Sequence, residues 1–237
     1  MSIIWHDLEC GAYAADMALW RALADEHGDP VLDVGAGTGR IALDLARHGH
    51  RVVALDRDPA LVEELGRRAG ELAVTAVAAD AREFELGERF PLIIVPMQTI
   101  QLLGGTEGRR RFLSRAGAHL QDRGLVAVTI TEMPELYSVG DGLPVPLPDI
   151  REIDGVVYSS QPTAVREDPG GFVLERLRET IMPEGRREAE EDTIRLDRLT
   201  ADQFEHEARA AGLSLARRAE IPPTQDHVGS AVVMLRG

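Results

Sequence analysis

The segment Val31-Leu-Asp-Val-Gly-Ala-Gly-Thr-Gly-Arg40 constrains the fold more than any other part of this 237-residue chain. Its first residues are apolar and mostly β-branched, which is typical of a parallel strand buried on both faces. Residues 41–48 carry apolar side chains at helical spacing. Between them, Gly35, Gly37 and Gly39 permit positive φ angles and a close approach of a ligand to the backbone, beside the N–H groups of a helix start. The segment therefore predicts a strand, a ligand-binding turn with Ala36 inside it, and a helix.

Three classes of ligand-binding loop contain such glycines, and the neighbouring residues distinguish them. A dinucleotide-binding loop has its third glycine three residues after the second, where this chain has Arg40. A triphosphate-binding loop needs a lysine, and the sequence contains none. The remaining pattern, acid-x-Gly-x-Gly-x-Gly from Asp33 to Gly39, resembles the first motif of the class I S-adenosylmethionine-dependent methyltransferases. Asp33 suits this cofactor, because a carboxylate attracts the ammonium of a methionine moiety and would repel a diphosphate.

Acidic residues follow the next two predicted strands. Segment 51–56 predicts a second buried strand ending in Asp56, about 20 residues after the loop, where a carboxylate can accept both ribose hydroxyls of a nucleoside. A third strand, 73–79, precedes Asp80. The resemblance implies that Asp80 and Ala81 contact the adenine and that Arg57 also lies in the cofactor site.

Segment 90–103 predicts a fourth strand followed by a loop and a helix. In the family that the chain resembles, this loop faces the methyl group. The resemblance therefore places Pro96 and Met97 at the methionine end of the cofactor, and Gln98 and Gln101 at the substrate. Family members often have acidic or amide residues near positions 91 and 96, and prolines at both remove a ready-made base from the loop.

The remaining pattern completes an α/β fold. Further strands are predicted at 124–131, 213–221 and 231–235, and helices at 11–27, 59–70, 109–120 and 200–212. We expect Arg109, Arg110 and Arg111 to lie on a solvated helix face. These elements imply a doubly wound, mostly parallel, seven-stranded sheet in a single domain covering residues 1–237. The resemblance implies a Rossmann-like methyltransferase fold with strand order 3-2-1-4-5-7-6 and an antiparallel last strand.

Residues 134–199 interrupt the alternation of strands and helices. Prolines and glycines predict a loop at 134–149, and alternating apolar and polar residues then predict three or four antiparallel strands. The strands are expected at 156–160, 163–167, 172–182 and 188–196. The position of this insertion is similar to that of the lids of glycine and amino-sugar N-methyltransferases. We expect an antiparallel β lid that selects the substrate.

Two histidines are candidates for a general base. The turn at 221–228 is expected near the rim of the glycine loop, so His227, oriented by Asp226 or another acid, is suited to deprotonate a hydroxyl acceptor. A solvated turn histidine is the alternative. His6 is the second candidate, in an N-terminal segment that the resemblance implies folds over the cofactor together with Tyr13. An amine acceptor can react as its free base and needs only positioning.

Charge and composition limit the partners. A formal net charge of −14 and a pI near 4.9 argue against a nucleic-acid substrate. The longest apolar run, 92–97, is too short to cross a membrane, and the acidic first residues do not form a secretory signal, so we expect a cytoplasmic protein. Cys10 is the only cysteine, which excludes an internal disulfide or a cysteine-based zinc site, and no metal is expected.

These observations predict S-adenosylmethionine-dependent methyl transfer to an oxygen or nitrogen of a small molecule, by a monomer or homodimer. Two other functions remain possible. One is a protein that binds S-adenosylmethionine without methyl transfer, such as a cyclase or a regulatory partner. The other is an NAD(P)-dependent oxidoreductase, which Arg40 and Asp33 disfavour.

Overall fold

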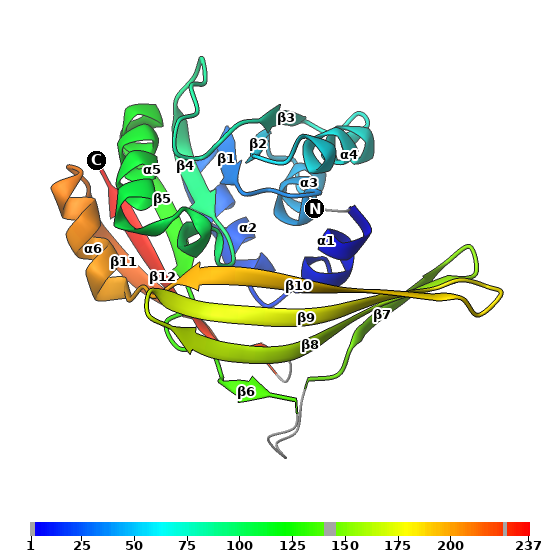
Figure 1. Cartoon of the computed structure of the whole chain (residues 1–237). Coiled ribbons are helices and arrows are strands. Elements are labelled where there is room, and N and C mark those ends of the chain that lie inside the picture. The colour runs from blue at the N-terminus through cyan, green and yellow to red at the C-terminus, as the bar shows by residue number, and fades with distance from the viewer. Residues whose placement is uncertain (1–2, 140–145, 225–226) are drawn as a thin grey trace.

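The computed structural model describes residues 3–139, 146–224 and 227–237. Its central sheet has seven strands in the order β11-β12-β5-β4-β1-β2-β3 (Figure 1). They are β1 (Val31–Val34), β2 (Val52–Asp56), β3 (Val74–Ala78), β4 (Phe90–Val95), β5 (Leu120–Ile130), β11 (Ser214–Ile221) and β12 (Ser230–Arg236). Strand β12 runs antiparallel to β5 and β11, whereas the pairs from β5 to β3 are parallel. The predicted sheet, its strand order and its antiparallel last strand are confirmed.

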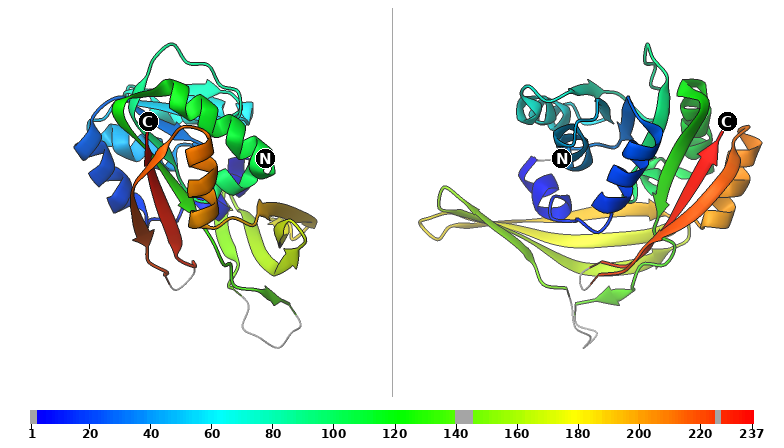
Figure 2. Two further views of the ribbon diagram at one scale, coloured as in Figure 1. Left: turned by 90° about the vertical axis from the view of Figure 1, so that its left-hand side faces the viewer. Right: turned by 180° about the vertical axis from the view of Figure 1, so that it is seen from behind.

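Helices cover both faces of this sheet (Figures 1 and 2). They are α1 (Ile3–Cys10), α2 (Met17–His27), α3 (Arg40–Arg47), α4 (Pro59–Ala69), the 3₁₀ helix η1 (Thr99–Leu102), α5 (Gly105–His119) and α6 (Ala201–Ala210). Apolar residues of α2, α3 and α4 pack on one face, around the fully buried Trp20. Those of α5 and α6 pack on the other, around Phe112 and Phe204. Because both faces are covered, all four residues of β1 are buried, as the apolar strand pattern predicts.

Local sequence signals set the starts of two helices. Asp58 caps α4 by accepting a hydrogen bond from the Ala60 N–H at 3.0 Å, and Pro59 occupies the first helical position. Thr200 and Gln203 form a capping box at the start of α6. Both helices therefore begin where the side chains satisfy otherwise unpaired backbone N–H groups.

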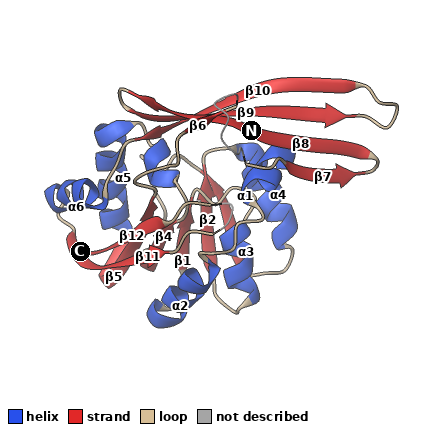
Figure 3. Cartoon of the chain, turned by 90° about the horizontal axis from the view of Figure 1, so that it is seen from below, coloured by secondary structure: helices blue, strands red, loops and turns tan. Residues whose placement is uncertain are grey.

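A second, antiparallel sheet lies across the end of the central sheet (Figure 3). Its strands are β6 (Tyr137–Ser138), β7 (Asp149–Ile153), β8 (Val156–Asp168), β9 (Gly171–Ile181) and β10 (Arg187–Asp197), in the order β10-β9-β8-β6 with β7 also paired to β8. We call these residues, 137–197, the inserted sheet. Its antiparallel character is confirmed. Segments 156–160 and 163–167 form one strand with an irregularity after Pro162, and the predicted loop at 134–149 contains β6 and the start of β7.

Two helices differ from the prediction. The predicted helix 11–27 begins only at Met17, and a separate helix, α1, precedes it. Helix α1 is short, and its sequence pattern is weak because only Trp5 and Leu8 are buried. Helix α5 begins at Gly105, earlier than the arginine run. Within the described part of the chain, no helix combines the length and apolar character that a bilayer-spanning segment needs.

Candidate active site

The glycine loop is fixed by hydrogen bonds to the end of β2. The N–H groups of Gly35 and Ala36 donate to the Leu55 carbonyl at 2.8 and 3.0 Å, and Gly37 N–H donates to Oδ2 of Asp56 at 2.8 Å. The loop glycines have positive φ angles, and a Cβ at Gly37 would lie 2.2 Å from Nε2 of His6. A side chain at this position would therefore strain the backbone and clash with the imidazole.

Asp33 lies under this loop in the middle of the sheet. Its side chain is 1% exposed, and among the described residues Oδ2 has no hydrogen-bond partner. Burial raises the pKa of Asp33 to about 7, and the nearby charge of Arg40 opposes this rise. A buried acceptor without a partner needs an explanation, and a cationic ligand provides one.

Asp56 is half-buried at the end of β2 and accepts two backbone hydrogen bonds. Besides Gly37, the N–H of Asp58 donates to its Oδ1 at 2.9 Å. A carboxylate offers about four lone-pair sites, so two remain for ribose hydroxyls. The side chain of Arg57 is exposed, so its predicted cofactor contact has no support in this conformation.

Asp80 follows β3, where the resemblance implies an adenine contact. Its carboxylate accepts from Arg82, with 2.9 Å between Nε and Oδ1, and also from the Arg82 backbone N–H at 2.8 Å. Hydrogen bonding to Arg82 lowers the pKa of Asp80, so it is a charged acceptor at neutral pH. Ala81 beside it is buried.

The loop after β4 has an unusual backbone. Pro96 is buried, and Met97 has a φ of 55°, although it is not a glycine. Thr129 of β5 stabilises this conformation through a hydroxyl hydrogen bond to the Met97 carbonyl. Strained backbone of this kind is concentrated at functional sites. Gln98 is half-buried, and its amide lies 3.3 Å from the Thr131 hydroxyl.

Gln101 has a structural role instead of the predicted substrate contact. Its side chain is 1% exposed. Its amide nitrogen donates to the carbonyls of Thr131 and Asp197, both at 3.0 Å, and its oxygen accepts from Thr131 N–H at 2.9 Å. Gln101 thus joins the end of β5 to the end of β10, and both hydrogens of its amide and one lone pair of its oxygen are used within the protein.

Helix α1 lies against the glycine loop. His6 contacts Gly37, and its Nδ1 is 3.3 Å from the Thr38 hydroxyl. Burial lowers the pKa of His6, and nearby carboxylates, first Asp56, oppose this effect. His6 therefore lies beside the expected ribose position. This placement favours a role in covering the glycine loop over a role in proton transfer at the methyl group.

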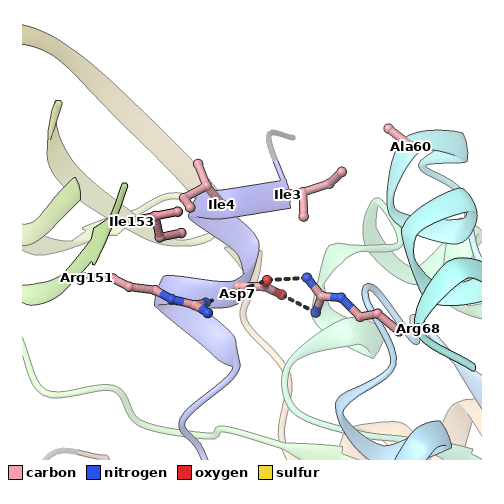
Figure 4. Close-up of a pocket in the computed structure, with 7 residues that line it drawn as sticks. All are labelled: Ile3, Ile4, Asp7, Ala60, Arg68, Arg151 and Ile153. Atoms are coloured by element: carbon pink, nitrogen blue, oxygen red, sulfur yellow. Dashed lines mark hydrogen bonds and ion pairs between the residues drawn. The ribbon is translucent and has the colours of Figure 1, made fainter. Parts of the chain in front are cut away.

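Charged pairs hold α1 between the core and the inserted sheet. A pocket beside α1 is lined by Ile3, Ile4, Asp7, Ala60, Arg68, Arg151 and Ile153 (Figure 4). Asp7 pairs with Arg68 of α4, with 2.9 Å between Oδ1 and Nη1, and Arg151 of β7 approaches it to 3.9 Å. On the inserted sheet, Glu9 accepts from Nε of Arg178 at 2.7 Å and from Ser160 at 2.8 Å. Helix α1 therefore links the two sheets.

Tyr13 and His227 lie together. Their ring centroids are 4.8 Å apart, although 214 positions separate them in the sequence. His227 is exposed, and its backbone N–H donates to the Thr224 hydroxyl at 3.0 Å, within its own turn. Asp226, its predicted acidic partner, lies outside the described residues.

Comparisons with known proteins agree with this geometry. Residues 31–124 match a family described as "Methyltransferase domain". These residues are therefore similar to a methyltransferase domain. This match confirms the resemblance that the glycine loop indicates.

Similar proteins extend the comparison beyond this methyltransferase domain. A cypemycin N-terminal methyltransferase of Streptomyces is 29% identical over 113 residues, covering 48% of this chain and 46% of that relative. The chain thus matches less than half the length of this curated relative. A sugar N-methyltransferase from Streptoalloteichus has a similar structure, with a TM-score of 0.72, 19% identity and coverage of 99% of this chain and 92% of that one. An amino pentose methyltransferase from Micromonospora echinaspora has a TM-score of 0.71, 18% identity and coverage of 100% and 98%.

Besides the Glu9–Arg178 pair, sequence reasoning missed two other buried arginines and their carboxylate partners. Asp16 is fully buried and pairs with Arg40, with 2.6 Å between Oδ1 and Nη1, and Arg40 also donates to the Tyr13 carbonyl at 2.8 Å. Arg109 is 4% exposed and pairs with Asp197 and Glu207 at 2.9 and 2.7 Å. The predicted solvated face is therefore wrong for Arg109. No local pattern reveals these pairs, because the partners are 24 to 98 positions apart.

Proposed function

We propose that this chain transfers the methyl group of S-adenosylmethionine to the nitrogen of a small-molecule amine. One observation carries the proposal: a buried carboxylate, Asp33, with an unpartnered oxygen lies under a glycine loop whose rim holds a second carboxylate, Asp56. An ammonium beside Asp33 and a ribose beside Asp56 fit these two groups. S-Adenosylmethionine contains both, and the solved amino pentose methyltransferase is described with it bound.

In this proposal, residues of the chain bind and orient the cofactor and the acceptor. Asp33 neutralises the ammonium, Asp56 accepts the ribose hydroxyls, and Asp80 accepts from the adenine amino group. When bound, the cofactor supplies an electrophilic methyl group on a sulfonium. The loop at Met97 and Gln98 and the facing inserted sheet hold the acceptor in line. Orientation alone contributes about 7–11 kcal/mol in well-aligned reactions, so this site needs no strong base.

Three observations support an amine as the acceptor. Pro91 lies within β4 and Pro96 directly follows it, so neither position provides a carboxylate to deprotonate a hydroxyl. Several structurally similar proteins are N-methyltransferases of sugars or glycopeptides. The net charge of −14 attracts cationic molecules and disfavours nucleic acids.

Calorimetry and product analysis test this function. S-Adenosylmethionine and S-adenosylhomocysteine should bind with one site each, and NADH should not. Incubation with S-adenosylmethionine and a panel of amines should give S-adenosylhomocysteine and a methylated amine by mass spectrometry. Cofactor binding without product across amines and alcohols would indicate a binding protein, and tight NADH binding would overturn the proposal.

The raised pKa of Asp33 predicts pH-dependent cofactor affinity. The carboxyl group is mostly protonated below its pKa of about 7, and only the charged form attracts an ammonium. S-Adenosylhomocysteine should therefore bind about tenfold more tightly at pH 8 than at pH 6, with release of a proton. Calorimetry in two buffers of different protonation enthalpy measures both effects.

Asp33→Asn is the control for this pH dependence. It should bind weakly and equally at both pH values, and an unaltered pH profile would exclude Asp33 from the cofactor site. Stability has the opposite sign: because folding raises this pKa from 3.8, the contribution of Asp33 is full below pH 3.8 and is lost as the pH rises through about 7.

His227 is the candidate base for a hydroxyl acceptor. If the acceptor is an amine, which reacts as its free base, we expect His227 to contribute little to turnover. Because His227 is exposed and its ring Nδ1 lies 3.5 Å from the Thr224 hydroxyl of its own turn, His227→Ala should lower turnover less than about tenfold, whereas a general base contributes about 10²–10⁴-fold. Steady-state kinetics from pH 6 to 9 measure this. A hundredfold loss of kcat with unchanged cofactor affinity would instead make His227 the base.

A further inference from the structure

Two unpartnered polar atoms belong to residues on neighbouring strands of the inserted sheet. Among the described residues, the buried side-chain atoms without a hydrogen-bond partner are Asp33 Oδ2, Arg176 Nε and Asp192 Oδ2. The cofactor explains the first of them. Arg176 on β9 and Asp192 on β10 are directly opposite in the strand register. Polar groups buried without partners are rare and costly, so two neighbouring ones need an explanation.

Both residues are on the sheet face that looks toward the core. Side chains two positions apart on a strand share a face, and Arg178, two residues after Arg176, reaches Glu9 of α1 and lies over the Trp5 ring at 5.6 Å. Arg176 Nη1 is also 3.5 Å from the Ser160 hydroxyl, which itself bonds Glu9. The face of Arg176 is therefore the face that α1 covers.

The pair lies between two attachments of the inserted sheet to the core. On one side, Arg178 binds Glu9 near the end of α1, just before the segment that carries Tyr13. On the other, the Asp197 carbonyl at the end of β10 binds Gln101, next to the loop that carries Met97 and Gln98. The position opposite the expected methyl group is bounded by these same segments.

Arg176 and Asp192 do not satisfy each other. Arg176 has its nearest charged partner in Asp149, at 3.8 Å, and Asp192 pairs through Oδ1 with Arg178 at 2.9 Å. The side chains are 18% and 25% exposed, so each reaches accessible space with part of its length. One atom donates and the other accepts, and their formal charges cancel. A hydroxyl group, which both accepts and donates, complements this pair better than a carboxylate or a phosphate.

We propose that Arg176 and Asp192 together bind a hydroxyl group of the methyl acceptor, so that the acceptor is a hydroxylated amine. This rests on the proposed function. The guanidinium donates to the hydroxyl oxygen, and the carboxylate accepts its proton in a hydrogen bond. Such charge-assisted bonds are the strong ones in a partly buried site, so they select among amines.

The test uses the full chain saturated with S-adenosylhomocysteine and two amines, D-glucosamine and cyclohexylamine, which share a six-membered ring and differ in hydroxyl groups. Calorimetry should show D-glucosamine binding at least about tenfold more tightly. Arg176→Met and Asp192→Leu should each remove this difference and leave the affinity for S-adenosylhomocysteine unchanged. Arg195→Met, an exposed arginine on the other face of β10, is the matched control and should have no effect.

Each other outcome has a stated meaning. Equal affinity for both amines, no binding of either at about 50 mM, or full discrimination in the variants overturns the inference. Within the described part of the chain, Arg176 makes only distant polar contacts, at 3.5 and 3.8 Å, so Arg176→Met should melt no lower than Arg195→Met, and a markedly lower Tm would show a structural role and overturn the inference. Asp192→Leu also removes the 2.9 Å ion pair with Arg178, so a lower Tm is expected for that variant and its binding data are taken at a temperature where it is folded. Failure of S-adenosylhomocysteine to bind the wild-type protein contradicts the proposed function itself.

Discussion

Replacing Asp56 with alanine is expected to weaken S-adenosylmethionine binding at least tenfold. In the proposed function, the change removes two hydrogen bonds from Asp56 to the ribose hydroxyls, each worth about 1.5–3 kcal/mol because the acceptor is charged. It also removes the acceptor for Gly37 N–H, at 2.8 Å, which holds the glycine loop against β2. Isothermal titration calorimetry with S-adenosylmethionine and S-adenosylhomocysteine measures the loss.

Asp58→Ala is the matched control for Asp56→Ala. This neighbouring aspartate caps α4 through Ala60 N–H, so its loss should reduce the free energy of unfolding by about 0.5–2 kcal/mol and leave cofactor affinity nearly unchanged. If Asp56→Ala bound as tightly as the wild type, or if both variants lost affinity equally, the ribose role of Asp56 would be refuted.

Breaking the ion pair between Glu9 and Arg178 is expected to cost about 3–5 kcal/mol of unfolding free energy. Both side chains are almost fully buried, at 4% and 7% exposure, and Arg178→Met leaves a carboxylate without its main partner. Urea denaturation followed by circular dichroism measures the change. Trp5 fluorescence reports the contact between α1 and the inserted sheet, so the loss of stability should be largest when unfolding is followed by this signal.

A double variant distinguishes pairing from burial. Glu9→Leu with Arg178→Met removes both charges, and its cost should be below that of either single change, because no almost fully buried charge is left alone and only the partly exposed Asp192 loses its contact with Arg178. Arg195→Met, which removes an exposed ion pair with Asp168, should cost at most about 1 kcal/mol. Equal costs for single and double variants would contradict a buried, coupled pair.

Local sequence patterns were sufficient to predict the individual strands of the central sheet. The apolar run at Val31, the three glycines and Asp56 lie within about 25 residues of one another. The run predicts a buried strand, the glycines a turn with positive φ angles, and Asp56 the end of the next strand. The apolar strands are buried on both faces, so their sequences differ clearly from those of the helices. Strand order came from the family resemblance, and the structure agrees with it.

Long-range contacts explain what the sequence did not reveal. Helix α1 is stabilised by Glu9 and Arg178, which are 169 positions apart, and its own periodicity is too short to predict it. Gln101 is a polar residue at a position where the sequence predicts a substrate contact. Only its burial and its three backbone partners show a structural role. Arg109 likewise looks solvated until its two carboxylates, from 88 and 98 positions away, are placed around it.

The attachment of α1 to both sheets limits how this protein can be re-engineered. The sequence pattern alone predicts that replacing residues 150–196 by a linker spares cofactor binding. The replacement would also remove Arg178 and Arg151, however, and so release the helix whose His6 contacts Gly37. A chimaera that receives the inserted sheet of a structurally similar protein should therefore receive that protein's N-terminal helix as well. The first ten residues and the insertion are one exchangeable unit, although more than a hundred residues of the cofactor-binding core separate them in the chain.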